Sequence, residues 1–165
     1  MSRIYVSDTN IWIDFRNAGL LDELFRLPIT LCCSDFVVGE LHDLSIDTLL
    51  ASGLRIESLD DQAIGRLSAL MSAHNNSSLA DVSCYLLALE TGRPLLTGDG
   101  RLRRQAEKDG VEVYGALWLL DQMVQHMVVT PGRARRGLQA MLERGARLPE
   151  TECRFRLLAW ENEGR

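Results

Sequence analysis

Two aspartates follow short apolar segments of the kind that form buried strands. Asp8 comes directly after the segment at residues 4–7, and Asp99 comes just after the segment at residues 95–97. In an open parallel sheet, the functional crevice lies at the carboxyl ends of the strands. We therefore expect both carboxylates to lie at that edge of a sheet.

Two further acids lie in unusually apolar surroundings. Asp81 is the only charged residue between Leu79 and Leu89, and Glu40 directly follows the sequence Phe-Val-Val-Gly. A carboxylate on a largely buried helix costs several kcal/mol, as a rough magnitude, unless it has a partner. Each of these acids therefore needs a partner.

These four acids have a shared chemistry if the fold brings them together. Each pair of carboxylates at short range repels by about several kcal/mol at intermediate dielectric. Such a group either takes up protons or binds a hard divalent cation, and oxygen ligands suit Mg²⁺ or Mn²⁺ better than zinc. Because such ions activate water and stabilise phosphodiester displacement, the four acids predict metal-dependent phosphoryl chemistry.

Each acid also has a purely structural role open to it. Asp8 and Asp99 could each cap the helix that follows. Asp81 could form a capping box with Ser78, and Glu40 could face water on its helix. Taken singly, the acids leave both interpretations open, and it is their convergence that would favour the chemical one.

The elements that position these acids alternate between short β-rich segments and helical ones. This alternation predicts an α/β fold in which helices cover both faces of a parallel sheet. The segment at residues 79–90 is apolar almost all round, which indicates a buried helix. The predicted strands are 4–6, 29–33, 54–56, 95–97 and 111–113, and the predicted helices are 9–17, 35–42, 43–51, 60–73, 79–90, 101–108, one ending near 128, 134–144 and 150–160, with a loop at 75–77.

Composition places the chain among ordinary globular proteins. It has 165 residues, of which 46% are hydrophobic and 25% charged, so it holds one domain of typical size. The longest apolar stretches are shorter than the roughly 18 residues that a membrane span needs, and Asp8 stands where a signal peptide would be apolar. We expect a cytoplasmic protein without a membrane contact.

Charge and cysteine content narrow the class of protein further. The net charge of −5 argues against a protein built mainly to coat nucleic acid. Residues 1–100 carry 14 acids and 6 bases, whereas residues 101–165 carry 9 acids and 12 bases. This asymmetry fits an acidic site beside an anion-binding surface, and it equally fits scattered solvated charge. The four cysteines form no CxxC pair, so we expect small buried side chains rather than a zinc site.

In their order and spacing, these motifs resemble those of the PIN-domain family. Residues 4–14 are similar to the family's first strand, its acid and the following Thr-Asn, and residues 37–41 to its helix with a glutamate. Residues 79–81 and 86–99 resemble the segments with its last two acids. The resemblance spans about residues 3–125. It implies a three-layer α/β/α fold with a five-stranded parallel sheet, in a PIN-like domain at 1–130 followed by a helical extension at 131–165 that packs on the same domain.

The resemblance also implies a function. It is that of a Mg²⁺- or Mn²⁺-dependent endoribonuclease, as in the VapC-type toxins of type II toxin–antitoxin pairs, which form homodimers and bind small antitoxins. The implied partners are therefore an RNA substrate, a cognate antitoxin and a second copy of the chain. The positions that match the family's catalytic, metal-binding acids are Asp8, Glu40, Asp81 and Asp99, with Thr97 and Asn10 as supporting polar groups.

Three arginines follow the last of these acids. Arg101, Arg103 and Arg104 would bind RNA phosphates if they lie at the mouth of the crevice, and otherwise form a solvated helix face.

Two other functions compete with the ribonuclease. Gly98 and Gly100 stand where many family members have polar residues, which favours a PIN-like module that binds nucleic acid or protein with little or no catalysis. A phosphohydrolase of the haloacid-dehalogenase type would need Asp-x-Asp after the first strand, where this chain has Asp8-Thr9-Asn10.

Overall fold

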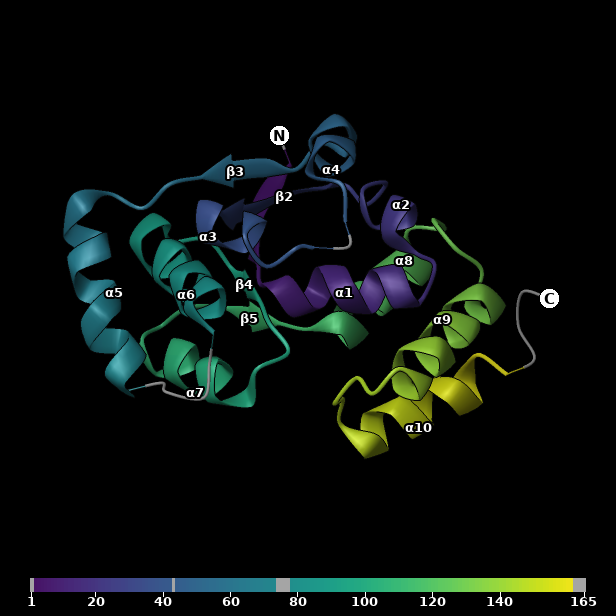
Figure 1. Cartoon of the computed structure of the whole chain (residues 1–165). Coiled ribbons are helices and arrows are strands. Elements are labelled where there is room, and N and C mark those ends of the chain that lie inside the picture. The colour runs from purple at the N-terminus through teal and green to yellow at the C-terminus, as the bar shows by residue number, and fades with distance from the viewer. Residues whose placement is uncertain (1, 43, 74–77, 162–165) are drawn as a thin grey trace. The chain divides into compact units, whose positions relative to one another are not determined.

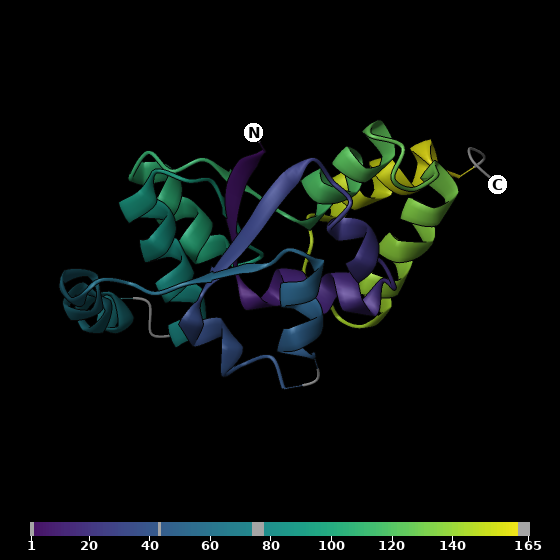
Figure 2. The same cartoon turned by 90° about the horizontal axis from the view of Figure 1, so that it is seen from above.

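Five parallel strands form the sheet that was predicted, in the order β3-β2-β1-β4-β5 (Figures 1 and 2). The computed structural model describes residues 2–42, 44–73 and 78–161. The central strand β1 pairs with β2 on one side and with β4 on the other, and Ser7 lies opposite Leu96. Asp8 therefore leaves the sheet level with Thr97. The strands are β1 (Arg3–Ser7), β2 (Ile29–Ser34), β3 (Arg55–Glu57), β4 (Leu95–Leu96) and β5 (Val113–Tyr114).

The chain divides into two compact units. The sheet unit holds residues 1–10 and 28–114, and the helical unit holds residues 11–27 and 115–165. The predicted boundary at residue 130, with an extension packed on the same domain, stays a prediction. The helices are α1 (Thr9–Asn17), α2 (Leu21–Leu24), α3 (Asp35–Val38), α4 (Ile46–Ser52), α5 (Asp61–Ala73), α6 (Leu79–Thr91), α7 (Gly100–Lys108), α8 (Ala116–Gln125), α9 (Pro131–Glu143) and α10 (Glu150–Ala159).

Helix α6 is the buried helix that the apolar segment predicts. All nine residues from Ala80 to Ala88 are buried, and α6 packs against β1, β2 and α5 (Figure 1). The helix begins at Ser78, whose Oγ accepts a hydrogen bond of 3.0 Å from the Asp81 N–H. It ends at Gly92, which takes the left-handed conformation (φ 68°) that a glycine adopts without strain.

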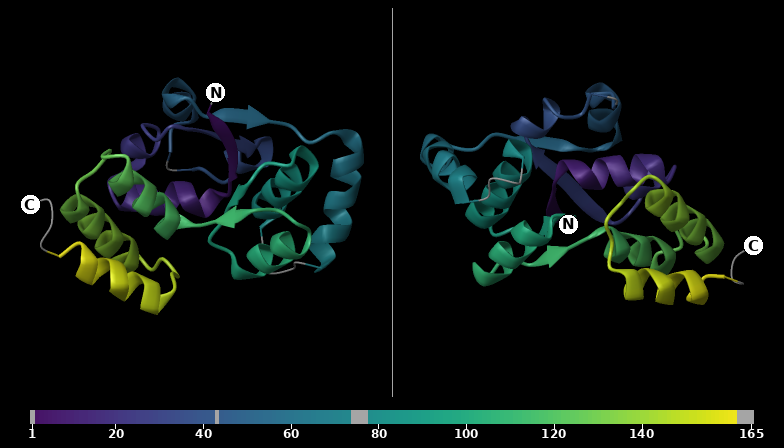
Figure 3. Two further views of the ribbon diagram at one scale, coloured as in Figure 1. Left: turned by 180° about the vertical axis from the view of Figure 1, so that it is seen from behind. Right: turned by 60° about the horizontal axis from the view of Figure 1, so that its bottom comes forward.

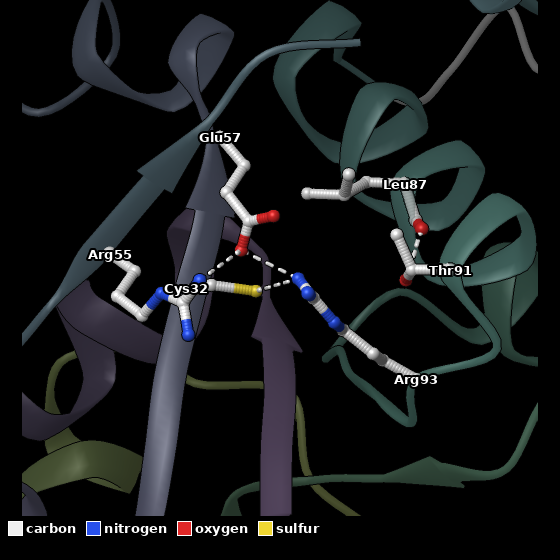
Figure 4. Close-up of polar contacts among 6 residues, drawn as sticks. All are labelled: Cys32, Arg55, Glu57, Leu87, Thr91 and Arg93. Carbon is white, nitrogen blue, oxygen red and sulfur yellow. Dashed lines mark hydrogen bonds and ion pairs between the residues drawn. The ribbon is translucent and has the colours of Figure 1, made fainter.

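An ion pair ties the carboxyl end of α6 to the far strands of the sheet (Figure 4). Arg93, just past the helix, lies 2.6 Å from a carboxylate oxygen of Glu57 on β3, and both side chains are about three-quarters buried. The same guanidinium donates to the Cys32 sulfur on β2 at 3.6 Å. Because the pair is largely removed from water, it resists screening better than a surface salt bridge does. This contact sets how α6 lies across the sheet.

Two helices differ from the prediction. The helix predicted at 35–42 is only one turn long, because α3 ends at Val38 and the chain turns at Gly39; Glu40 therefore lies in the turn that follows. The short helix α2 was not predicted, since four residues are too few to show a hydrophobic period. The predicted loop at 75–77 lies outside the described residues.

In the helical unit, α9 lies beside both α8 and α10 (Figure 3). Helices α9 and α10 pack together, and α8 packs against α2 and α9. Arg156 on α10 makes two hydrogen bonds, of 2.8 and 2.7 Å, to the two carboxylate oxygens of Asp121 on α8. Within the described ranges, no helix is long and apolar enough to cross a membrane.

Two helical glycines allow a matched test of this packing. A Cβ on Gly137 would lie 2.6 Å from Cδ1 of the fully buried Leu20, whereas a Cβ on Gly65 of α5 would meet nothing within 4 Å. We expect Gly137→Ala to lower the free energy of unfolding by about 1–3 kcal/mol through overpacking. We expect Gly65→Ala to raise it by about 0.5–1 kcal/mol, because alanine restricts the unfolded chain. Urea unfolding of both variants measures the difference, and equal shifts in the same direction would contradict the packing of α9.

Candidate active site

Asp8 lies fully buried where β1 ends. Its Oδ2 accepts a hydrogen bond of 2.6 Å from the Thr97 hydroxyl and one of 3.2 Å from the Gly98 N–H. Because β1 and β4 are neighbours in register, the loop after β4 is brought directly against this carboxylate. The strand-end position that the sequence indicated for Asp8 is therefore correct.

Asp99 is joined to the same loop. Its backbone N–H donates to the Thr97 hydroxyl at 3.0 Å, so one threonine links both strand-end acids. Its Oδ1 accepts from the N–H groups of Arg101 and Leu102, at 2.9 and 3.3 Å, and caps α7. The capping role considered for Asp99 is thus real. It leaves the position of the acid at the edge of the sheet unchanged.

Asp81 lies in the first turn of α6 with only 6% of its surface exposed. Its carboxylate accepts a hydrogen bond from the Thr9 N–H, at the start of α1. Its Oδ1 is buried and has no hydrogen-bond partner within the described part of the chain. A buried carboxylate oxygen without a donor is costly, so this atom is suited to an added ligand.

Glu40 reaches the site from the turn after α3. It is half-buried, and its Oε2 accepts a hydrogen bond of 3.4 Å from the hydroxyl of Ser78, which also caps α6. Ser78 therefore joins Glu40 to the helix that carries Asp81. The helical position predicted for Glu40 is wrong, because Gly39 ends the helix one residue earlier.

Asp81 feels the charges of the three other acids. Burial, the largest cause, and the charges of Asp8, Glu40 and Asp99 together raise the pKa of Asp81 from 3.8 to about 7. The Thr9 N–H opposes the shift in this pKa by donating to the charged carboxylate. Without a cation, Asp81 therefore holds a proton near neutral pH, which relieves the repulsion among the carboxylates.

The donor set suits a hard cation, although it is not yet closed around one. Carboxylate oxygens are the ligands that Mg²⁺ and Mn²⁺ prefer, and Asp81 offers an oxygen with no other partner. Among the described residues, no three His, Cys, Asp or Glu side chains stand close enough together to hold a metal ion. Binding would therefore require the carboxylates to draw together.

The remaining predicted residues belong to the same sheet unit. Asn10 is the second residue of α1 and is exposed. Arg101, Arg103 and Arg104 follow Asp99 in the first turns of α7, where Arg101 and Arg104 are exposed and Arg103 is half-buried. The three arginines thus stand on the helix that Asp99 caps.

Sequence reasoning missed a set of small polar groups between α6 and the ends of β1 and β2. Ser34, Ser83 and Cys84 are fully buried and contact one another between α6 and the end of β2. The one available signal was a Ser-Cys pair inside the otherwise apolar segment at residues 79–90. Its partner on β2 is some 50 positions away, which no local pattern reveals.

Comparison with known proteins places this arrangement in a family. The family model described as DUF3368: PIN domain matches residues 4–162, so the chain belongs to the PIN-domain family. PIN domains are typically nucleases, bind nucleic acids and generally use divalent metals.

One solved structure adds support for the fold. It is a PilT N-terminus domain protein from the hyperthermophilic archaeon Sulfolobus solfataricus P2, with a TM-score of 0.51 and 15% identity. The match covers 74% of this chain and 95% of that one. The likeness confirms the predicted α/β/α fold class with its five-stranded parallel sheet. No curated protein matches the chain significantly.

The crowding of the acids predicts an unusual effect of Asp81→Asn. In wild type, the unfolded state loses the Asp81 proton near pH 3.8 and the native state near pH 7, so stability falls as the pH rises between these values. Asparagine removes the charge, so this fall diminishes. We expect the metal-free variant to be more stable than wild type at pH 8 by at least about 1 kcal/mol. Urea unfolding between pH 5 and pH 8 measures both the slope and the difference.

Glu107→Gln is the control, because Glu107 is an exposed acid on α7. Its stability should follow that of wild type at each pH. Burial also raises the pKa of Asp14, to about 6. Its effect on the pH dependence of stability is the same in wild type, Asp81→Asn and Glu107→Gln, so it cancels in the comparison. If Asp81→Asn is less stable than wild type by the same amount at pH 8 and at pH 5, the charges of the other acids do not destabilise the ionised Asp81.

Proposed function

We propose that this protein is a metal-dependent endoribonuclease that hydrolyses RNA phosphodiester bonds. The observation that supports the proposal most is that the charges of Asp8, Glu40 and Asp99 act on the buried Asp81, whose Oδ1 has no hydrogen-bond partner among the described residues. The metal is Mg²⁺ or Mn²⁺, with these four acids as its ligands and as the catalytic residues. When bound, such an ion supplies an activated water and neutralises charge that develops on the phosphate.

The chain's own residues prepare the site for that chemistry. Thr97 orients Asp8 by donating to its Oδ2, and its hydroxyl also holds the Asp99 backbone in place. Asp81, whose pKa is raised to about 7, would give up its proton on binding a cation. Asn10 supports the acids from the start of α1. No side chain is required to form a covalent intermediate.

The arginines of α7 would hold the substrate. RNA carries one negative charge per phosphate, and guanidinium groups bind phosphate through paired hydrogen bonds. Arg101, Arg103 and Arg104 follow the capping residue Asp99, so bound phosphates would lie beside the acids.

We further propose that the protein is the toxin of a type II toxin–antitoxin pair, in the cytoplasm. The excess of acids in residues 1–100 supports a small partner whose arginines neutralise the site. A homodimer and a cognate antitoxin are the assemblies that this proposal requires. Mass spectrometry of the complex purified from its own cells tests both partners.

A specific observation favours a second function, that of a module that binds nucleic acid or protein without catalysis. In the described residues, the carboxylates are not closed around a metal position, and one oxygen of Asp99 is occupied as a helix cap. For this function, RNA binding would be independent of divalent metal.

Cleavage of a fluorescent single-stranded RNA distinguishes the two functions. We expect turnover with Mn²⁺ or Mg²⁺, no turnover with EDTA, and a loss of at least about 100-fold in Asp8→Asn and Asp99→Asn, because each removes a negative ligand. Glu107→Gln should retain full activity. The rate is measured per mole of folded protein, with far-UV circular dichroism as the check on folding.

Two results would contradict the ribonuclease. One is cleavage that persists in both Asp→Asn variants, which would assign the activity to a contaminant. The other is tight RNA binding in EDTA with no turnover in any divalent ion, after mass spectrometry has shown that no inhibitor copurifies. That second result is what the binding module predicts.

A further inference from the structure

A fully buried polar cluster lies between the first turns of α6 and the ends of β1 and β2. It consists of Ser34 at the end of β2 and of Ser83 and Cys84 on α6. Buried polar side chains are rare in the apolar interface between a helix and a sheet, since each must be hydrogen-bonded to offset its desolvation. Their presence here therefore calls for a structural or functional reason.

The contacts of the cluster run from α6 to the ends of two strands. The Ser34 and Ser83 hydroxyls are 2.5 Å apart, and Ser83 donates its own proton to the Ala80 carbonyl at 2.6 Å. The proton between the two serines therefore comes from Ser34. The Cys84 thiol donates to the carbonyl of Ser7, the last residue of β1, at 3.3 Å.

Each strand end in this cluster is followed along the chain by one of the four acids, at once in one case and after a short helix in the other. Ser7 precedes Asp8, and Ser34 precedes the short helix α3 that ends just before Glu40. Residues 80–84 of α6 receive all of these contacts, and Asp81 lies within that turn. The polar cluster thus connects the backbone segments that carry three of the four acids.

We infer that Ser34, Ser83 and Cys84 are positioning residues, which fix the depth of Asp81 against Asp8 and Glu40 by pinning the first turns of α6 to the ends of β1 and β2. The inference deepens the proposed function and rests on it. The ion pair of Arg93 with Glu57 fixes the opposite end of α6 (Figure 4). With only that end held, repulsion among the carboxylates would push the first turn of the helix outward.

Apolar residues of the same size would pack this interface but would not resist that push. Packing is nondirectional, whereas a hydrogen bond between fixed backbone segments holds both distance and direction. A cluster with a merely structural role would affect stability alone. A positioning cluster also affects the contact between Asp81 and the start of α1.

The Thr9 amide reports this contact without metal or activity. Thr9 is the first residue of α1, so its N–H has no acceptor within the helix and is protected by Asp81. The Asp8 N–H is the reference, because it donates to the Leu96 carbonyl within the sheet at 3.0 Å. Amide exchange followed by NMR in EDTA gives the ratio of the two rates.

Three variants test the cluster. In Cys84→Ala and in the double variant Ser34→Ala/Ser83→Ala, we expect Thr9 to exchange at least about tenfold faster relative to Asp8. Cys84→Ser keeps a donor for the Ser7 carbonyl, so it should restore the wild-type ratio. The double variant leaves no orphaned hydroxyl and is therefore expected to fold. The dissociation constant for Mn²⁺, measured by calorimetry, should rise about 10-fold in the first two variants.

Ala88→Gly is the matched control, since Ala88 is a buried residue of α6 that lies outside the cluster. It should lower stability while leaving the Thr9-to-Asp8 ratio unchanged. An unchanged ratio in both Cys84→Ala and the double variant would overturn the inference. If the ratio changes in these variants but the wild-type protein cleaves no RNA, the positioning role is upheld and only the nuclease is rejected.

Discussion

Repulsion among carboxylates is the constraint on which the site of this protein depends. The charges of Asp8, Glu40 and Asp99 act on Asp81, and the burial of Asp8 and Asp81 weakens the screening of this repulsion by water. A fold gains no stability from such an arrangement. It persists only because the rest of the sheet unit holds each acid from a different direction, and because Asp81 keeps a proton until a cation replaces it. This state is suited to a metal-binding site, since stability is given up where a ligand is to bind.

Contacts of the sheet and of α6 hold the acids in place against this repulsion. Parallel pairing of β1 with β4 brings Asp8 level with Thr97, and one hydroxyl then joins both strand-end acids. Helix α6 contributes Asp81 from above the sheet edge. It is held at one end by the buried polar cluster and at the other by the ion pair of Arg93 with Glu57. These contacts are hydrogen bonds and an ion pair. Directional polar contacts therefore position the acids, while apolar packing forms the surrounding core.

Sequence reasoning located the acids better than it located the elements that carry them. Asp8 and Asp99 were identified because each follows a short apolar segment that predicts a buried strand. The carboxyl ends of parallel strands lie at the same edge of the sheet. The burial of α6 was evident from its composition. The helix predicted to carry Glu40 was wrong, since Gly39 ends α3 after one turn.

Contacts between distant segments could not be predicted. Ser34 with Ser83, and Arg93 with Glu57, join residues that only the tertiary fold brings together. A hydroxyl in an apolar helix looks the same in sequence whether it bonds its own carbonyl or a neighbouring strand. The four acids could be named from the chain, but the way in which they are held required the structure.

Proton release on Mn²⁺ binding tests the central claim most directly. Calorimetry at pH 6.5 in two buffers of different ionisation enthalpy counts the protons that leave when the metal binds. The account predicts saturable binding with the release of most of one proton, and little release in Asp81→Asn. Binding without proton release, or no binding to the wild-type protein, would contradict the claim that Asp81 holds a proton that a cation replaces.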